Sequence, residues 1–312
     1  MSGFVGAFQV LEYVYAPSGE HVGCVRQRRA LEPLGDGRVR VRQTCAPDEA
    51  LRAFIARAGD VDPTSGVMRR FEGEHLFELV VDGAVRRYLG PAVRGAGFAH
   101  GEGAMTGRGV WPELGYAFRS FSVLVSPRRQ VTGGAFLVGS ALAARILGVA
   151  SPEGEAPPEL LESPPPGAVA RVWSGTRRAF ASTGARIYEG PVERRYHAPP
   201  GEGASAAFAG FEERDAEGAV DLEITWEPIG SHLRARGRAF DDGALAPLVG
   251  IGRRLGPALE LSAVVGEAET RDWLEVYDAE AGCLVSVREA YRDGRWAHTE
   301  ITKLLPTPLR AA

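Results

Sequence analysis

The sequence predicts a mainly β protein built from antiparallel strands. Short β-rich runs separated by turn signals recur along the whole chain, and helical patterns are few. The pattern is most regular near the two ends, in residues 11–45 and 272–304, where three runs are separated by two turns. The second turn is Asp-Gly in both, at Asp36-Gly37 and Asp293-Gly294. Asp-Gly between alternating runs favours a β-hairpin, so we expect a β-sandwich or β-barrel class.

Several motifs occur once in each half of the chain, which indicates an internal duplication. Val85-Arg86-Arg87-Tyr88 resembles Glu193-Arg194-Arg195-Tyr196, and Cys24 falls in the first end segment where Cys283 falls in the last. The two end segments are therefore predicted to adopt the same three-stranded form. The aligned pairs are then Cys24 with Cys283, Val39 with Trp296, Val41 with His298 and Gln43 with Glu300.

Proline and glycine divide the chain. Residues 151–167 are rich in proline, which predicts an extended linker between an N-terminal domain, residues 1–150, and a C-terminal domain, residues 168–312. Helices are expected from about residue 46 to 59 and from 140 to 147. Residues 95–109 alternate glycine with small residues and are expected to form a long loop.

Composition narrows the class of partner. The net charge is −4 and no basic stripe is present, so we expect no nucleic acid. Three cysteines without a Cys-x-x-Cys motif favour a reducing, cytoplasmic compartment. The N-terminus does not resemble a signal peptide. The most apolar run, residues 135–150, is short and contains Arg145, so no membrane partner is expected. The oligomeric state is not predicted.

One segment resembles a nucleotide-binding motif. Residues 130–143 are similar to the V-T-G-G-A-x-x-x-G-S opening of extended short-chain dehydrogenases, in which glycines admit a pyrophosphate. However, Phe136 replaces the middle glycine, and the preceding strand is polar where a buried parallel strand is apolar. The Tyr-x-x-x-Lys pair of that family is absent, because Thr299 lies four residues before Lys303. A nucleotide-dependent oxidoreductase is therefore the least favoured function.

Two short motifs resemble the Gly-x-Trp of lipocalin-like (calycin) proteins. They are Gly109-Val110-Trp111 and Gly294-Arg295-Trp296. The resemblance implies two antiparallel β-barrel (lipocalin-like) domains with a few short helices. Tandem barrels of this type include carriers and enzymes that cyclise or isomerise apolar substrates. A barrel of about eight strands can hold one small ligand.

Alternation along the last three strands suggests a site in the second domain. Side chains two residues apart lie on one face of a strand, so Trp296, His298, Glu300 and Thr302 share a face. If this face lines a cavity, His298 and Glu300 form the catalytic acid–base pair. The alternative places Leu274, Val276, Leu284 and Ile301 inward instead. The expected substrate-binding residues are Trp273, Glu275, Tyr277, Glu289, Tyr291 and Trp296.

The expected function is binding of a small, largely apolar molecule in a barrel cavity, with cofactor-independent acid–base chemistry of the cyclase or isomerase type as an extension. A non-catalytic ligand-binding or interaction module is the alternative. No cofactor is expected, and no histidine pairing of the zinc-site type occurs. Residues 194–197 form a second candidate cluster, for which an exposed strand end is the preferred interpretation.

Overall fold

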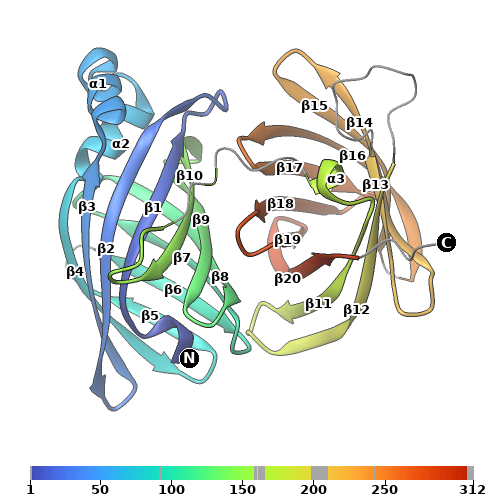
Figure 1. The fold of residues 1–312 in the computed structure, drawn as a ribbon, viewed down its shortest axis with the longest axis horizontal. Helices are drawn as coiled ribbons and strands as arrows, with labels where there is room; N and C mark the ends of the chain where they lie inside the picture. The colour runs from blue at the N-terminus through green and yellow to red at the C-terminus, as the bar shows by residue number, and fades with distance from the viewer. Residues whose placement is uncertain are drawn as a thin grey trace. The chain divides into compact units, whose positions relative to one another are not determined.

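The protein folds as two closed β-barrels, each made of ten antiparallel strands (Figure 1). The computed structural model describes residues 2–90, 93–157, 160, 166–197, 210–241 and 243–307. The chain divides into two compact units, Met1–Glu159 and Leu160–Ala312, and each unit contains one barrel. The predicted fold class, mainly β with two antiparallel barrels and a few short helices, is confirmed.

The first barrel closes by pairing its last strand with its first. Strand β10 pairs antiparallel with β1, and each other strand pairs with its neighbours in sequence. A short 3-10 helix, Ser2–Phe4, precedes β1, and two α-helices lie between β3 and β4. The elements are β1 (Gly6–Tyr15), β2 (His21–Gly35), β3 (Arg38–Pro47), α1 (Glu49–Ala58), α2 (Pro63–Phe71), β4 (Gly73–Asp82), β5 (Val85–Leu89), β6 (Arg94–His100), β7 (Ala104–Trp111), β8 (Tyr116–Ser126), β9 (Arg129–Val138) and β10 (Ala141–Pro152).

The second barrel has the same up-and-down order and closes through β11 and β20. A helix of one turn, α3 (Pro166–Val169), precedes it. Its strands are β11 (Val172–Ala181), β12 (Arg186–His197), β13 (Gly210–Arg214), β14 (Val220–Ile229), β15 (His232–Asp241), β16 (Ala244–Leu255), β17 (Ala258–Val265), β18 (Glu269–Asp278), β19 (Cys283–Arg292) and β20 (Arg295–Pro306).

Part of the predicted linker has regular structure. Strand β10 continues to Pro152 and α3 begins at Pro166. Residues 158–159 and 161–165 lie outside the described residues. The domain boundaries at 150 and 168 therefore stay a prediction.

The end segments form three-stranded antiparallel meanders, β1–β3 and β18–β20. Both Asp-Gly turns have positive φ at both residues: 49° and 70° in the first barrel, 51° and 71° in the second. These values belong to the type I′ hairpin turn. Arg29 pairs with Gln43 on the first meander, and Arg288 pairs with Glu300 on the second. Cys24 and Cys283 each precede these arginines by five residues, so the predicted alignment agrees with the ladder at this position.

Helices α1 and α2 pack against the first barrel and join its interior core. Asp48 caps α1 by accepting from the Leu51 N–H at 2.8 Å, and Asp62 caps α2 by accepting from the Ser65 N–H at 2.9 Å. The predicted helix over residues 46–59 is confirmed by α1, whereas α2 was not predicted. Their buried residues, among them Phe71, belong to the same cluster as inward-facing strand residues. The helices therefore cover part of the barrel interior.

The predicted helix over residues 140–147 is wrong, because this segment lies in strand β10. Residues 146–151 are buried without interruption, on both faces of the strand. A strand buried on both faces lacks the alternation that distinguishes strand from helix in a sequence. The Thr64 hydroxyl of α2 donates to the Ala143 carbonyl at 2.6 Å, so helix packing contributes to this burial.

The predicted loop over residues 95–109 is also wrong, because it forms the hairpin β6–β7. Its glycines face one another across the ladder, Gly95 opposite Gly109 and Gly97 opposite Gly107. A Cβ at Gly107 would overlap the Tyr88 hydroxyl, and a Cβ at Gly97 would lie 3.0 Å from it. Glycine is required here because the Tyr88 ring lies across this part of the sheet.

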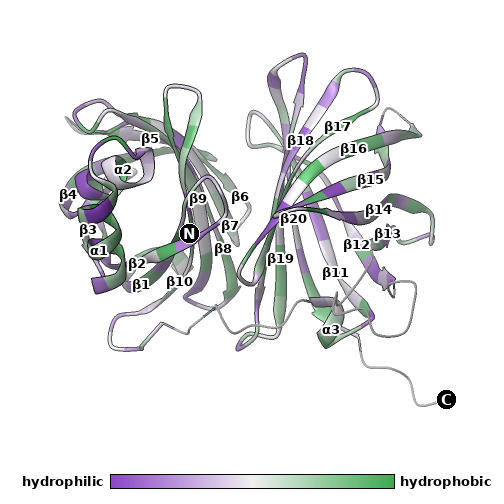
Figure 2. Ribbon diagram, turned by 90° about the horizontal axis from the view of Figure 1, so that it is seen from above, coloured by the Kyte–Doolittle hydropathy of each residue, from purple (hydrophilic) through white to green (hydrophobic). Residues whose placement is uncertain are grey.

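Hydrophobic and hydrophilic residues alternate along many strands of both barrels (Figure 2). In β3, buried and exposed residues alternate along nearly the whole strand. Contacts between non-neighbouring strands identify the inward face. For example, Glu213 of β13 contacts Arg288 of β19, and this contact must cross the barrel interior. Strand parity and register therefore determine which side chains meet inside.

Replacing the glycine of each Asp-Gly turn tests the left-handed conformation of these two turns. Gly294→Ala is expected to cost about 1 kcal/mol, because alanine disfavours the left-handed conformation and the added Cβ meets nothing within 4 Å. Gly37→Ala should cost more, because its Cβ would also lie 2.8 Å from the Val81 carbonyl oxygen. Thermal unfolding of both variants gives the comparison, and equal losses would contradict it.

Candidate functional sites

The first barrel contains a partly open cavity of about 160 Å³. Its lining comes from strands around the whole barrel and from α2, so the cavity lies in the barrel interior. One part of the wall is aromatic and aliphatic, and the other is polar. The apolar lining includes Leu31, Val41, Phe71, Phe77, Leu79, Met105, Trp111, Phe118, Phe136 and Ile146, and the polar lining includes Glu12, Gln27, Arg29, Gln43, Arg86, Tyr88, Ser120, Ser122 and Thr132.

The aromatic wall is a continuous set of ring contacts. Trp111 packs edge-on against Phe77 with ring centroids 5.8 Å apart, and Tyr88 packs edge-on against Phe118 at 5.7 Å. Phe77 and Tyr88 connect the two pairs at 6.0 Å. Such edge-to-face contacts hold each ring in one orientation. The wall is therefore largely formed before any ligand enters.

The polar wall contains one buried carboxylate, Glu12, which is 1% exposed. The Gln27 amide donates to Glu12 Oε2, and Arg29 Nη2 lies 3.7 Å from Glu12 Oε1. Burial raises the pKa of Glu12 to about 7, although the positive charge of Arg29 and the Gln27 hydrogen bond act in the opposite direction. Burial raises the pKa of the Cys45 thiol of β3 to about 12, and the charge of Glu12 acts in the same direction.

Arg86 supplies a second positive charge to this wall and is 4% exposed. Its Nη1 donates to the Ala84 carbonyl at 3.5 Å. Burial lowers the pKa of Arg86, with Tyr88 acting in the opposite direction. Burial and the charge of Arg86 also lower the pKa of His100 to about 4, so His100 is neutral at physiological pH.

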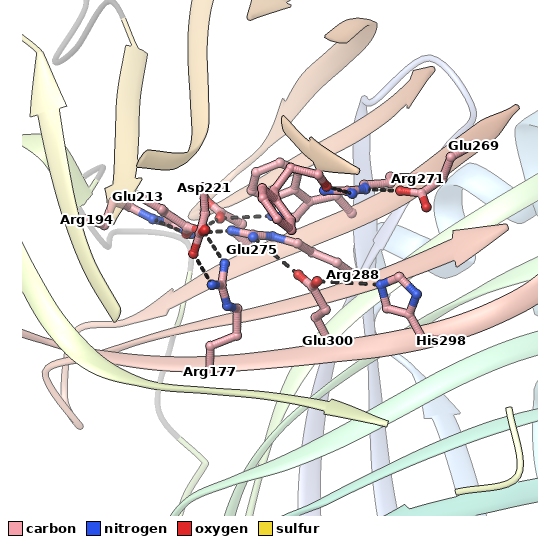
Figure 3. Close-up of polar contacts among 12 residues, drawn as sticks. Arg177, Arg194, Glu213, Asp221, Glu269, Arg271, Glu275, Arg288, His298 and Glu300 are labelled. Atoms are coloured by element: carbon pink, nitrogen blue, oxygen red, sulfur yellow. Dashed lines mark hydrogen bonds and ion pairs between the residues drawn. The ribbon is translucent and has the colours of Figure 1, made fainter. Parts of the chain in front are cut away.

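The interior of the second barrel contains a network of paired charges (Figure 3). Glu213 accepts from Arg194 Nη2 and from Arg288 Nη2, each at 2.5 Å. Arg194 also pairs with Glu275 at 2.6 Å, and Arg177 pairs with Asp221. Glu213 and Arg194 are both 0% exposed. Each of these buried charges therefore has an opposite charge in contact with it, as burial requires.

The predicted acid–base pair lies beside this network. His298 Nε2 is 3.5 Å from Glu300 Oε1, and Arg288 Nη1 is 3.5 Å from Glu300 Oε2 (Figure 3). Burial alone would raise the pKa of Glu300, but the hydrogen bond with His298 and the charges of Arg288, Arg271 and Arg177 hold it well below its usual range. Glu300 is therefore ionised near neutral pH and is a weak proton acceptor.

The structure brings together some of the predicted substrate-binding residues. Trp273, Glu275 and Tyr277 share the inward face of β18; the Trp273 indole donates to Glu275 at 2.9 Å and the Arg288 guanidinium lies 3.8 Å from the Trp273 ring centre. Leu284 is also inward, as part of the same core cluster.

Glu289, Tyr291 and Trp296 lie on the opposite, outer face. A register shift between Ala290 and Tyr291 skips Ala297 of β20, which pairs Trp296 with Tyr291. The Tyr291 hydroxyl donates to Glu289 at 2.9 Å. The prediction that Trp296 shares a face with His298 and Glu300 is wrong, because a β-bulge reverses the side-chain direction beyond it.

The second candidate cluster, residues 194–197, is not the exposed strand end that the sequence favoured. Arg194 and Tyr196 are buried and point inward, whereas Arg195 and His197 are exposed. The repeated motif Arg-Arg-Tyr thus puts an inward arginine and tyrosine in both barrels: Arg86 and Tyr88 in the first. The repetition was visible in the sequence, but its burial was not.

The nucleotide-motif segment forms antiparallel strands β9 and β10 with a turn at Gly139-Ser140. The helix N-terminus on which a pyrophosphate would rest is therefore absent from this segment. In the described part of the chain, no group of three or more His, Cys, Asp or Glu residues has the arrangement of a metal site. The described helices are all too short or too polar to span a membrane.

Comparisons with known proteins support the fold. No protein-family model matches the sequence, and no curated protein matches it. A solved structure from Nostoc punctiforme, a protein of unknown function from the DUF3598 family, aligns with a TM-score of 0.58 over 98% of this chain and 97% of that chain, at 11% identity. This likeness shows the tandem-barrel fold alone. A variant of the Rh. blastica porin aligns at a TM-score of only 0.21 and 7% identity, over 96% of this chain and 98% of that chain.

Glu12→Gln tests the buried carboxylate of the first barrel. The folded-state pKa of about 7 lies above the unfolded value of 4.5, so stability falls as pH rises from 4.5 to 7, by roughly 3 kcal/mol in total. Glutamine keeps an acceptor for Gln27 but cannot ionise. The variant should match the wild type at pH ~5 and exceed it at pH ~8 in thermal unfolding, with the exposed Glu32→Gln as control. Equal pH profiles would contradict it.

Glu213→Gln tests the charge network of the second barrel. Burial would raise the pKa of Glu213, but Arg288, Arg194 and Arg177 outweigh this and hold it at about 2. The stability that this group contributes is therefore present above pH 4.5 and lost as pH falls toward 2. The substitution should cost about 3–5 kcal/mol at neutral pH, because two arginines lose their carboxylate.

The control is Glu212→Gln on the outer face of the same strand, where Glu212 pairs with Arg214 at 2.8 Å. It should change stability by less than about 1 kcal/mol. Similar losses in the two variants, measured by urea unfolding, would show that the inward network does not hold the barrel.

Proposed function

We propose that the protein binds a small, largely apolar molecule in the cavity of its first barrel. The observation that carries the proposal is the cavity itself, which lies inside a closed barrel and has an aromatic wall on one side and a polar wall on the other. Small-molecule sites are concave and mostly apolar, with a small number of placed polar groups. The volume of about 160 Å³ is close to that of an apolar cavity that binds benzene, of about 150 Å³.

The proposal assigns binding, without catalysis, to this barrel. The His298–Glu300 pair belongs to the other unit, and Glu300 is held ionised by neighbouring arginines. A base with a strongly lowered pKa removes protons poorly at neutral pH. The acid–base extension therefore rests on His298 alone, with Glu300 as the carboxylate that orients it. We prefer the ligand-binding alternative for this reason.

A cavity-filling substitution tests the proposal. Val41 faces the cavity, and Val41→Phe should occupy part of its volume and abolish binding of benzyl alcohol or indole, measured by calorimetry on the whole protein. Overpacking is expected to cost about 1–3 kcal/mol of stability. The matched control is Val249→Phe, which adds the same ring at an exposed position of the second unit. Equal binding by Val41→Phe and the wild type would refute the proposal, as would failure of the wild type to bind any aromatic probe, neutral or acidic.

A further inference from the structure

The first barrel buries a positive charge that has no carboxylate partner. Arg86 is 4% exposed and lines the cavity, and its hydrogen bond goes to a backbone carbonyl. Among the residues that the structure describes, no carboxylate lies within ion-pair distance of its guanidinium. Burying a charge without an opposite charge is costly, so such a group is expected to meet a partner from outside the chain.

The second barrel shows what the same motif looks like when the chain supplies the partner. Arg194, in the matching Arg-Arg-Tyr motif, pairs with Glu213 at 2.5 Å and with Glu275 at 2.6 Å. Both arginines are inward, and both stand two residues before an inward tyrosine. The difference between them lies in the carboxylates opposite, which are present in one barrel and missing at Arg86.

The charges around Arg86 leave one positive charge uncompensated. Arg29, a second cation of the cavity lining, has Glu12 at 3.7 Å, and Arg119, which also lines the cavity, has interactions of its own. His100 is neutral because burial and Arg86 lower its pKa. Tyr88, beside Arg86, is held protonated because burial raises its pKa. With Glu12 ionised, Arg86 is the cation of this wall that has no carboxylate, and the wall is then suited to a single negative charge.

We infer that the ligand of the first barrel is a small apolar carboxylic acid whose carboxylate pairs with Arg86. The inference rests on the proposed function and adds the chemical class of the ligand. A planar guanidinium matches a carboxylate with two parallel hydrogen bonds. A phosphate monoester would bring close to two negative charges at neutral pH, more than Arg86 alone compensates. The cavity volume limits the apolar part to about one ring or a short chain.

Calorimetry with matched probes tests the inference on the whole protein. Benzoate and hexanoate carry the acid, and benzyl alcohol and 1-hexanol are their neutral counterparts. Benzoate or hexanoate should bind more tightly than its alcohol. Arg86→Met should weaken acid binding by about 10- to 100-fold, since a hydrogen bond to a charged group is lost, while alcohol binding is kept or improved. Arg87→Met, at the exposed neighbouring position, should change neither.

The outcomes separate the two proposals. If the alcohols bind, the acids bind no more tightly, and Arg86→Met binds the acids as tightly as the wild type, then the inference of a carboxylic acid ligand is refuted. The cavity proposal still stands in that case. If no probe binds, both fall. Tighter binding of phenyl phosphate than of benzoate, lost in Arg86→Met, would overturn the inference that the charged group of the ligand is a carboxylate.

Thermal unfolding without ligand gives a second readout. Arg86→Met should raise the melting temperature, because it removes an unpaired buried charge. Arg194→Met should lower it, because it leaves Glu213 and Glu275 without that partner. A loss in Arg86→Met as large as that in Arg194→Met would show that Arg86 has a partner within the chain, and would refute the inference.

Discussion

Closure of each barrel is the constraint on which the rest of the structure depends. Because β1 pairs with β10, and β11 with β20, every strand has two neighbours and each unit has one enclosed interior. Strand parity then divides the side chains between this interior and the outer face. A single irregularity is enough to change the assignment, as the skipped residue Ala297 does for Trp296. The chemistry inside a barrel is therefore decided by register.

The two interiors use polar residues in different ways. In the second barrel, arginines and carboxylates from neighbouring and non-neighbouring strands meet one another, and the arginines hold the pKa of Glu213 at about 2. In the first barrel, the charge of Arg29 and the Gln27 hydrogen bond do not offset the burial of Glu12, and the pKa of Glu12 rises to about 7. Acid therefore weakens the second interior, whereas alkali weakens the first. One interior is organised for internal pairing, and the other retains charges that the chain does not neutralise.

The sequence was sufficient for the fold class and for which side chains share a strand face. Asp-Gly turns and alternation placed the end meanders, and parity correctly grouped Trp273 with Glu275 and Tyr277, and His298 with Glu300, on shared faces. Parity alone did not decide whether those faces point inward. The sequence failed where its signals are ambiguous. The doubly buried β10 has no alternation, the glycines of β6 and β7 accommodate a ring from another strand, and a bulge has no reliable sequence signal. The cavity was not foreseen, because it depends on residues from nine strands and α2 meeting in space.

Arg86 connects these points to selectivity. A neutral molecule that fills the cavity would displace water from the guanidinium and leave the charge both desolvated and unpaired. A carboxylic acid of the same shape would gain the same apolar contacts and supply the missing negative charge. Sites that bury a polar group discriminate strongly against ligands that cannot pair with it. The discrimination in this barrel would thus come less from attraction of the acid than from the cost that Arg86 imposes on every neutral competitor.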